Sequence, residues 1–141
     1  CCSRATMARY YRNMGFYYLS SYNTDMAKAC YTYSNIYYHT DNADSELNYI
    51  ENALKEAKDK GVTKDDKEYD IRTMQAMFDK ENVEPGPDSK TIGIVYRVGE
   101  LMLQDKEYAL AKDCFSIVYD ITNEQQLEGV LAELDRCLEN A

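Results

Sequence analysis

The chain has 141 residues, which suits one domain with a core of its own. Its formal net charge of −9 argues against a nucleic-acid ligand, because binding phosphates requires a stripe of Lys and Arg side chains. The same charge favours basic peptides or proteins as partners, although acidity also serves simply to keep a protein soluble. There are 14 Tyr residues against three Phe and no Trp, so much of the apolar surface carries hydroxyl groups that need water or a partner.

Seven stretches show apolar residues at three- and four-residue spacings, and each is predicted to form a helix. They span residues 4–19, 25–40, 45–60, 64–80, 90–104, 107–121 and 124–140. A loop is expected at residues 81–89, because Pro85, Gly86 and Pro87 cannot continue a helix. No stretch alternates with a period of two for long enough to predict a strand. The expected fold is therefore all-α, in a single domain spanning residues 1–141.

Caps and turns are also predicted at the start of the chain. Asn23 or Thr24 can cap the second helix by accepting from its free backbone N–H groups. Residues 41–44 form a polar turn of the kind that joins antiparallel helices.

Gly93 and Gly99 lie within a helical pattern and are predicted to be sites of close helix packing.

Two helix pairs resemble the tetratricopeptide repeat, a helix-turn-helix unit of about 34 residues. In the second pair, Val98-Gly99 stands where the family has Leu-Gly, and Tyr108, Ala111 and Phe115 fall at signature positions of the following helix. The resemblance implies antiparallel helix pairs in a right-handed superhelix of about seven helices.

The first pair can be placed in two registers. In one, Tyr33-Ser34 stands for Leu-Gly, and Tyr49-Ile50 and Ala53 take packing positions; Glu46 replaces an expected Ala, and neither pair ends in the usual proline. In the other, the first two predicted helices form the pair, and the signature residues are Gly15, Ala27 and Tyr31. The first register predicts that Tyr33, Ile36 and Tyr37 belong to the core.

The family's first helices line a concave surface, and the resemblance places a candidate partner-binding groove there. Adjacent tyrosines point about 100° apart on a helix, so one member of each Tyr-Tyr doublet should reach a groove or an edge. Tyr31 and Tyr96 stand where a carboxylate-clamping subgroup has lysine, which disfavours that subgroup, although Asn35 is present. The groove residues implied are Lys28, Tyr31, Asn35, Tyr38, His39, Tyr96, Glu100, Leu103 and Gln104.

Catalytic and metal-binding patterns are nearly absent from the sequence. The sole histidine, His39, has no Cys or second His at ligand spacing and no nucleophile motif beside it. We therefore expect no enzymatic activity, no cofactor and no metal.

The cysteines and the start of the chain bear on location. The five cysteines lack metal-site spacing and are interpreted as free thiols in a reducing, cytoplasmic compartment, with no membrane span. Cys1 stands where Met would begin a full protein, so we expect a piece of a longer chain, or alternatively a lipid anchor on Cys1.

The leading functional hypothesis is a protein-interaction scaffold that holds a peptide or helix in a Tyr-rich groove. The alternatives are a regulatory or sensor domain that binds a small ligand, and a structural bacterial lipoprotein.

Overall fold

The computed structural model describes residues 3–21, 23–61 and 89–140, without the side chains of residues 57 and 90. All the regular elements within these ranges are α-helices, packed as antiparallel pairs, so the all-α prediction is confirmed for this part of the chain. The predicted helix at 64–80 and residues 81–88 of the predicted loop at 81–89 lie outside the described residues. Ser89, the last residue of that predicted loop, is instead the first residue of a helix. The helices are α1 Arg4–Ser20, α2 Thr24–Tyr37, α3 Asp41–Asp59, α5 Ser89–Gln104, α6 Tyr108–Thr122 and α7 Gln126–Glu139.

Side-chain caps explain where α2 and α3 begin. The side-chain Oδ1 of Asn23, one of the two predicted cap candidates, accepts from the Met26 backbone N–H at 3.2 Å. The Thr40 hydroxyl likewise accepts from the Ala43 N–H at 3.2 Å, so α3 starts earlier than expected. The predicted polar turn at 41–44 is therefore the first turn of α3, where the helix dipole favours Asp41 and Asp44.

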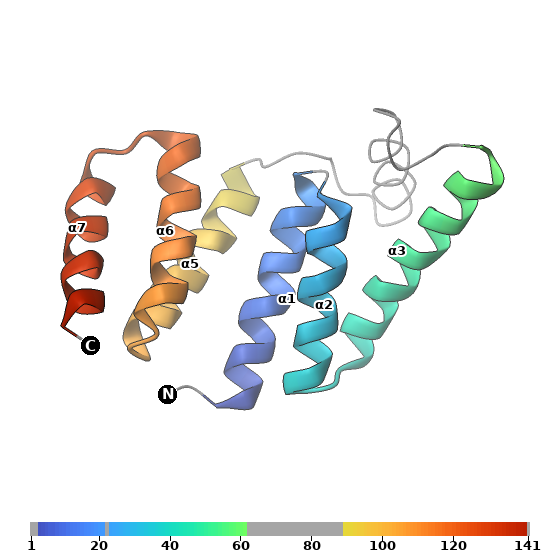
Figure 1. Ribbon diagram of the computed structural model, residues 1–141, viewed down its shortest axis with the longest axis horizontal. Helices are drawn as coiled ribbons and strands as arrows, with labels where there is room; N and C mark the ends of the chain where they lie inside the picture. Colours follow the sequence, from blue (N-terminus) through green and yellow to red (C-terminus); the bar gives the residue numbers. More distant parts are fainter. Residues whose placement is uncertain (1–2, 22, 62–88, 141) are drawn as a thin grey trace.

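The helices stand in a row whose spatial order differs from their order in the chain. α1 packs against both α2 and α5, while α3 packs on α2 and α7 packs on α6. In Figure 1 the row therefore reads α3, α2, α1, α5, α6, α7, and the chain rises through α1 and descends through α5. Among the described helices, α5 to α7 contact the N-terminal helices mainly through the packing of α5 on α1. This order departs from the simple succession of pairs expected of a superhelix.

Among the described residues, two hydrophobic clusters form the core. The larger crosses the α1–α5 contact and includes Tyr10, Met14, Val98, Met102 and Phe115. The smaller joins α1, α2 and α3 through Leu19, Ala27, Tyr31, Ile50 and Ala53.

The buried face of α2 differs from the one predicted. Tyr31 is fully buried, whereas Tyr33 and Ile36 are 51% and 61% exposed and Tyr37 is half-buried. The cause is the closeness of α1: the Ser34 hydroxyl donates to the Ala8 carbonyl oxygen at 2.8 Å, so this small residue faces α1. Tyr33 and Ile36, on the other side of α2, are left outside the core.

Close approach between helices occurs at two glycines. A Cβ atom at Gly15 would lie 3.0 Å from the Tyr31 ring, and one at Gly99 would lie 3.0 Å from Cys114 Cβ and 3.1 Å from the Phe115 ring. The contact at Gly15 joins α1 to α2. Gly99 is a close-packing site as predicted, but Gly93 is not one among the described residues, none of which would lie within 4 Å of a Cβ atom added there.

Replacing either close-packed glycine with alanine should destabilise the fold. Gly15→Ala and Gly99→Ala should each lower the free energy of unfolding by about 1–3 kcal/mol, because buried neighbours cannot move aside. Gly93→Ala is the matched control and should be neutral or stabilising by about 0.5–1 kcal/mol, since alanine favours helices. Urea unfolding followed by circular dichroism measures all three, and equal effects at Gly15 and Gly93 would contradict the packing argument.

Candidate functional site

The N-terminal members of the predicted groove are engaged in holding the fold. Asn35 Nδ2 donates to Asp44 Oδ1 at 2.8 Å, and Asn35 Oδ1 accepts from the Thr40 backbone N–H at 3.3 Å. His39 Nε2 lies 2.6 Å from Asp44 Oδ2. These contacts fasten the end of α2 to the first turn of α3.

Two further predicted groove residues, from α2, also make contacts within the fold. The prediction that Tyr31 lines the groove is wrong, because its ring fills the space above Gly15 and is inaccessible to a partner. Lys28 is exposed, and its Nζ lies 3.9 Å from Glu51 Oε1. Tyr38, just beyond the end of α2, is exposed.

The C-terminal members lie on α5, on the other side of α1 from α2 (Figure 1). Glu100 and Gln104 line a cleft between α1 and α5, whereas Leu103 lines a separate pocket beside α7. Tyr96 packs edge-on against Phe115, with ring centroids 5.4 Å apart. The nine predicted residues therefore do not form one continuous groove.

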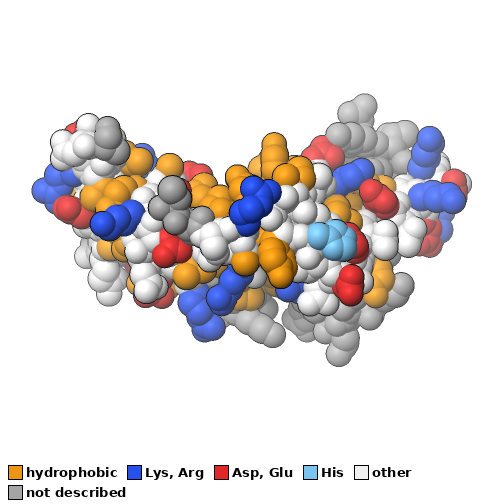
Figure 2. Space-filling view, turned by 90° about the horizontal axis from the view of Figure 1, so that it is seen from below, with side chains coloured by type: hydrophobic (Ala, Val, Ile, Leu, Met, Phe, Trp, Pro, Cys, Tyr) orange, Lys and Arg blue, Asp and Glu red, His pale blue; other side chains and the backbone are white. Residues whose placement is uncertain are grey.

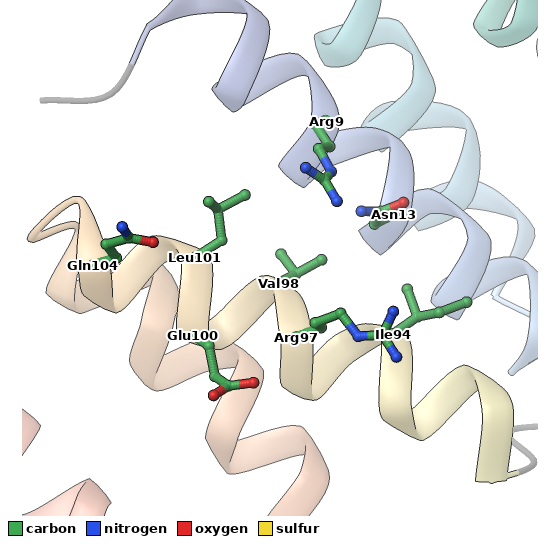
Figure 3. Close-up of a pocket in the computed structure, with 8 residues that line it drawn as sticks. All are labelled: Arg9, Asn13, Ile94, Arg97, Val98, Glu100, Leu101 and Gln104. Carbon is green, nitrogen blue, oxygen red and sulfur yellow. The ribbon is translucent and has the colours of Figure 1, made fainter.

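The α1–α5 cleft contains residues that the sequence interpretation missed. It encloses about 440 Å³, and Arg9 and Asn13 reach into it from α1, whereas Glu100 is directed away from α1 (Figure 3). Arg97 lines it from α5, and within the described residues neither arginine forms an ion pair. The cleft is thus locally basic in an acidic chain. In the sequence, the only indication of this cleft is that Arg9 and Arg97 lie outside the apolar positions of their helices.

A second groove, here called the tyrosine groove, lies between α1, α2 and α6. It encloses about 480 Å³. Tyr10, Tyr11 and Tyr18 come from α1, and Asp113 and Asp120 line the α6 side. The remaining lining residues are Met14, Met26, Cys30, Leu110, Ser116 and Ile117.

The Tyr10-Tyr11 doublet has one buried and one accessible ring, as predicted. Tyr10 is buried while its neighbour Tyr11 is half-buried, and their rings meet edge-on with centroids 5.0 Å apart. Burial raises the pKa of Tyr11 and of Tyr18, so both phenols are neutral hydrogen-bonding groups at ordinary pH. Desolvation also raises the pKa of the Asp113 carboxyl, against the opposing charge of Lys112.

An exposed aromatic cluster adjoins this groove. The Tyr11 ring lies 5.3 Å from that of Tyr33 and stacks on that of Tyr37 at 5.6 Å. The Arg4 guanidinium lies 5.2 Å from the Tyr37 ring centroid and donates to the Ile36 and Tyr37 carbonyl oxygens. Figure 2 shows hydrophobic and basic side chains exposed side by side near the single histidine. Tyr11 therefore belongs both to the groove and to an accessible aromatic surface.

One group of potential metal ligands occurs in the described part of the chain. Ligand atoms of His39, Asp41 and Asp44 lie within 4.8 Å of one another. His39 and Asp44 already contact each other, and the carboxylates sit on the first turn of α3, where the helix dipole accounts for them.

The described thiols are unpaired. Cys30 and Cys114 are buried free cysteines and Cys137 is partly exposed, which confirms the free-thiol prediction for these three; Cys1 and Cys2 lie outside the described residues. None of the described helices combines the length and apolar character of a membrane span.

Comparisons with family models, with curated proteins and with solved structures find no match to this chain. The candidate function therefore rests on the side chains of the clefts and grooves described above.

Stability should decline at alkaline pH because of the two buried thiols. Burial raises the pKa of Cys30 from 9.0 to about 11 and that of Cys114 from 9.0 to about 12. Above pH 9 the unfolded chain releases these protons while the folded chain keeps them. The contribution of the two thiols to the free energy of unfolding is thus complete below pH 9. It is lost as pH rises, at up to about 1.4 kcal/mol per pH unit for each thiol.

Urea unfolding between pH 8 and 10 measures this slope, and the double variant Cys30→Ala with Cys114→Ala is the control. The variant should show a flatter dependence on pH, whatever its absolute stability. An unchanged slope would assign the alkaline sensitivity to other groups, such as the buried tyrosines.

Proposed function

We propose that this protein is an interaction module whose tyrosine groove binds a partner segment that carries basic and apolar side chains. One observation carries the proposal: aromatic rings from α1 and two carboxylates from α6 line the same groove of about 480 Å³. Grooves of this size are typical of ligand sites.

The chemistry of the two walls favours a Lys or Arg side chain as the occupant. Tyr rings provide a rigid contact area at a low cost in conformational entropy, and their faces attract cations. The long stem of Lys or Arg can lie along Met14 and Ile117 while its charged end reaches Asp113 or Asp120. A cation placed there would also offset the desolvation that raises the pKa of Asp113.

The net charge of −9 supports the same class of partner at longer range. An acidic molecule attracts basic segments and speeds their association, and this steering weakens as salt is added. Binding should therefore be strongest at low ionic strength.

The proposal includes a tetratricopeptide-like packing of the helix pairs. Its support is the small-against-large contact of Gly15 with Tyr31 in α1–α2, and of Gly99 with Phe115 in α5–α6. A right-handed superhelix is not part of the proposal, because α5 packs against α1.

Removing the two carboxylates of the groove should weaken binding of a basic peptide. The probe is a fluorescein-labelled helical peptide with Lys and Leu on one face, compared with the same peptide carrying Glu in place of Lys. Asp113→Asn combined with Asp120→Asn should lower the affinity for the Lys peptide about tenfold, which is about 1.4 kcal/mol, in a fluorescence anisotropy titration.

Glu139→Gln is the control, since it removes one exposed negative charge at the end of α7, outside the groove. It should leave the affinity nearly unchanged, and the Glu peptide should bind poorly to every variant. If the double variant binds the Lys peptide as tightly as the control does, the tyrosine groove is not the binding site.

A further inference from the structure

The same contacts recur in the chain after an interval of 84 residues. Gly15 and Gly99 are separated by this interval, and so are the aromatic residues above them, Tyr31 and Phe115. A Cβ atom would lie 3.0 Å from the Tyr31 ring at Gly15 and 3.1 Å from the Phe115 ring at Gly99. The same interval relates the buried thiols of Cys30 and Cys114.

The same interval relates a polar contact between α2 and α3 to one between α6 and α7. Asn35 donates to Asp44 at 2.8 Å, and 84 residues later Tyr119 donates to Glu128 at 2.6 Å.

An ion pair between the same helices is repeated after the same interval. Lys28 pairs with Glu51 at 3.9 Å, and 84 residues later Lys112 pairs with Asp135 at 2.6 Å. The helices α1–α2–α3 and α5–α6–α7 therefore make matching contacts at matching positions, and each half can be compared with the other.

The two halves differ at a leucine that they share. Leu19 on α1 is 5% exposed, whereas its equivalent Leu103 on α5 is 39% exposed. In the first half Tyr49 of α3 packs against the cluster that contains Leu19. The residue equivalent to Tyr49 is Glu133 on α7, which has a carboxylate in place of the ring.

An apolar pocket of about 440 Å³ is present at this position of the second half. Leu103, Val130 and Leu134 provide apolar surface, and Gly129 adds no side chain to fill the space. Glu133 lies at the pocket but its carboxylate accepts from Arg136 on the same helix. The other lining residues are Gln126 and Cys137.

We propose that this pocket is a second docking site, which receives a Tyr or Phe side chain from a partner protein. The occupant's chemistry follows from the first half, where the chain supplies Tyr49 to the equivalent cluster. An aromatic ring would bury Leu103 as Leu19 is already buried, and apolar burial of this kind is the main favourable term in association. The site goes beyond the tyrosine groove, from which its lining residues are distinct.

The test uses p-cresol, the small-molecule analogue of the tyrosine side chain, as the probe. In a methyl NMR titration, p-cresol should produce saturable shifts at the Leu103, Val130 and Leu134 signals. Glu133→Tyr supplies the ring from the chain itself, so it should weaken p-cresol binding about tenfold or more at these signals. Leu103→Glu, which places a charge in the pocket, should weaken it similarly while circular dichroism shows the helices retained.

Ala132→Tyr is the matched control, because it adds the same ring to an exposed position of α7 that does not line the pocket. It should bind p-cresol as the wild type does. Wild-type shifts that do not saturate, or a Glu133→Tyr variant that binds normally, would overturn the proposal. So would sedimentation showing a wild-type dimer that Glu133→Tyr dissociates, because the occupant would then be a second copy of this chain.

Discussion

The close approach of helices at Gly15 and Gly99 is the constraint on which the rest of the structure depends. A glycine lets the facing ring of Tyr31 or Phe115 pack directly on the backbone of the neighbouring helix. That contact decides which side of α2 and of α6 is turned inward. Once those faces are set, the remaining side chains of each helix are distributed to other contacts or to the surface.

The surfaces of the protein follow from this arrangement. With Tyr31 turned towards α1, Tyr33 and Ile36 face outward, and Tyr33 joins Tyr11 in an exposed aromatic cluster. The packing of α5 on α1 then brings α6 across from the tyrosines of α1 and creates the tyrosine groove. The opposite charges of the groove and of the α1–α5 cleft show that the net charge of the chain does not describe each site. Local lining residues determine what each can bind.

Part of the fold and of the candidate site could be predicted from local pattern. Apolar spacing located the described helices, and Asn23 was one of the two residues predicted to cap α2. The Tyr10-Tyr11 doublet correctly indicated one buried and one accessible ring. The assignment of Tyr31 to the surface failed, because the apolar residues of α2 extend around more than one side of the helix. Periodicity alone does not decide between two such faces when the neighbouring helix is unknown. Packing against the closest neighbour, α1, determines which face of α2 is buried.

The sequence by itself determined the helices, their caps and the supply of tyrosine, since these depend on residues within a few positions of one another. Only the tertiary structure decided that α1 packs against both α2 and α5, and hence that Tyr18 and Asp120 share a groove. The physical reason is that residues about 100 positions apart meet through the combined shape of several helix faces. No short-range spacing in the chain encodes that combination.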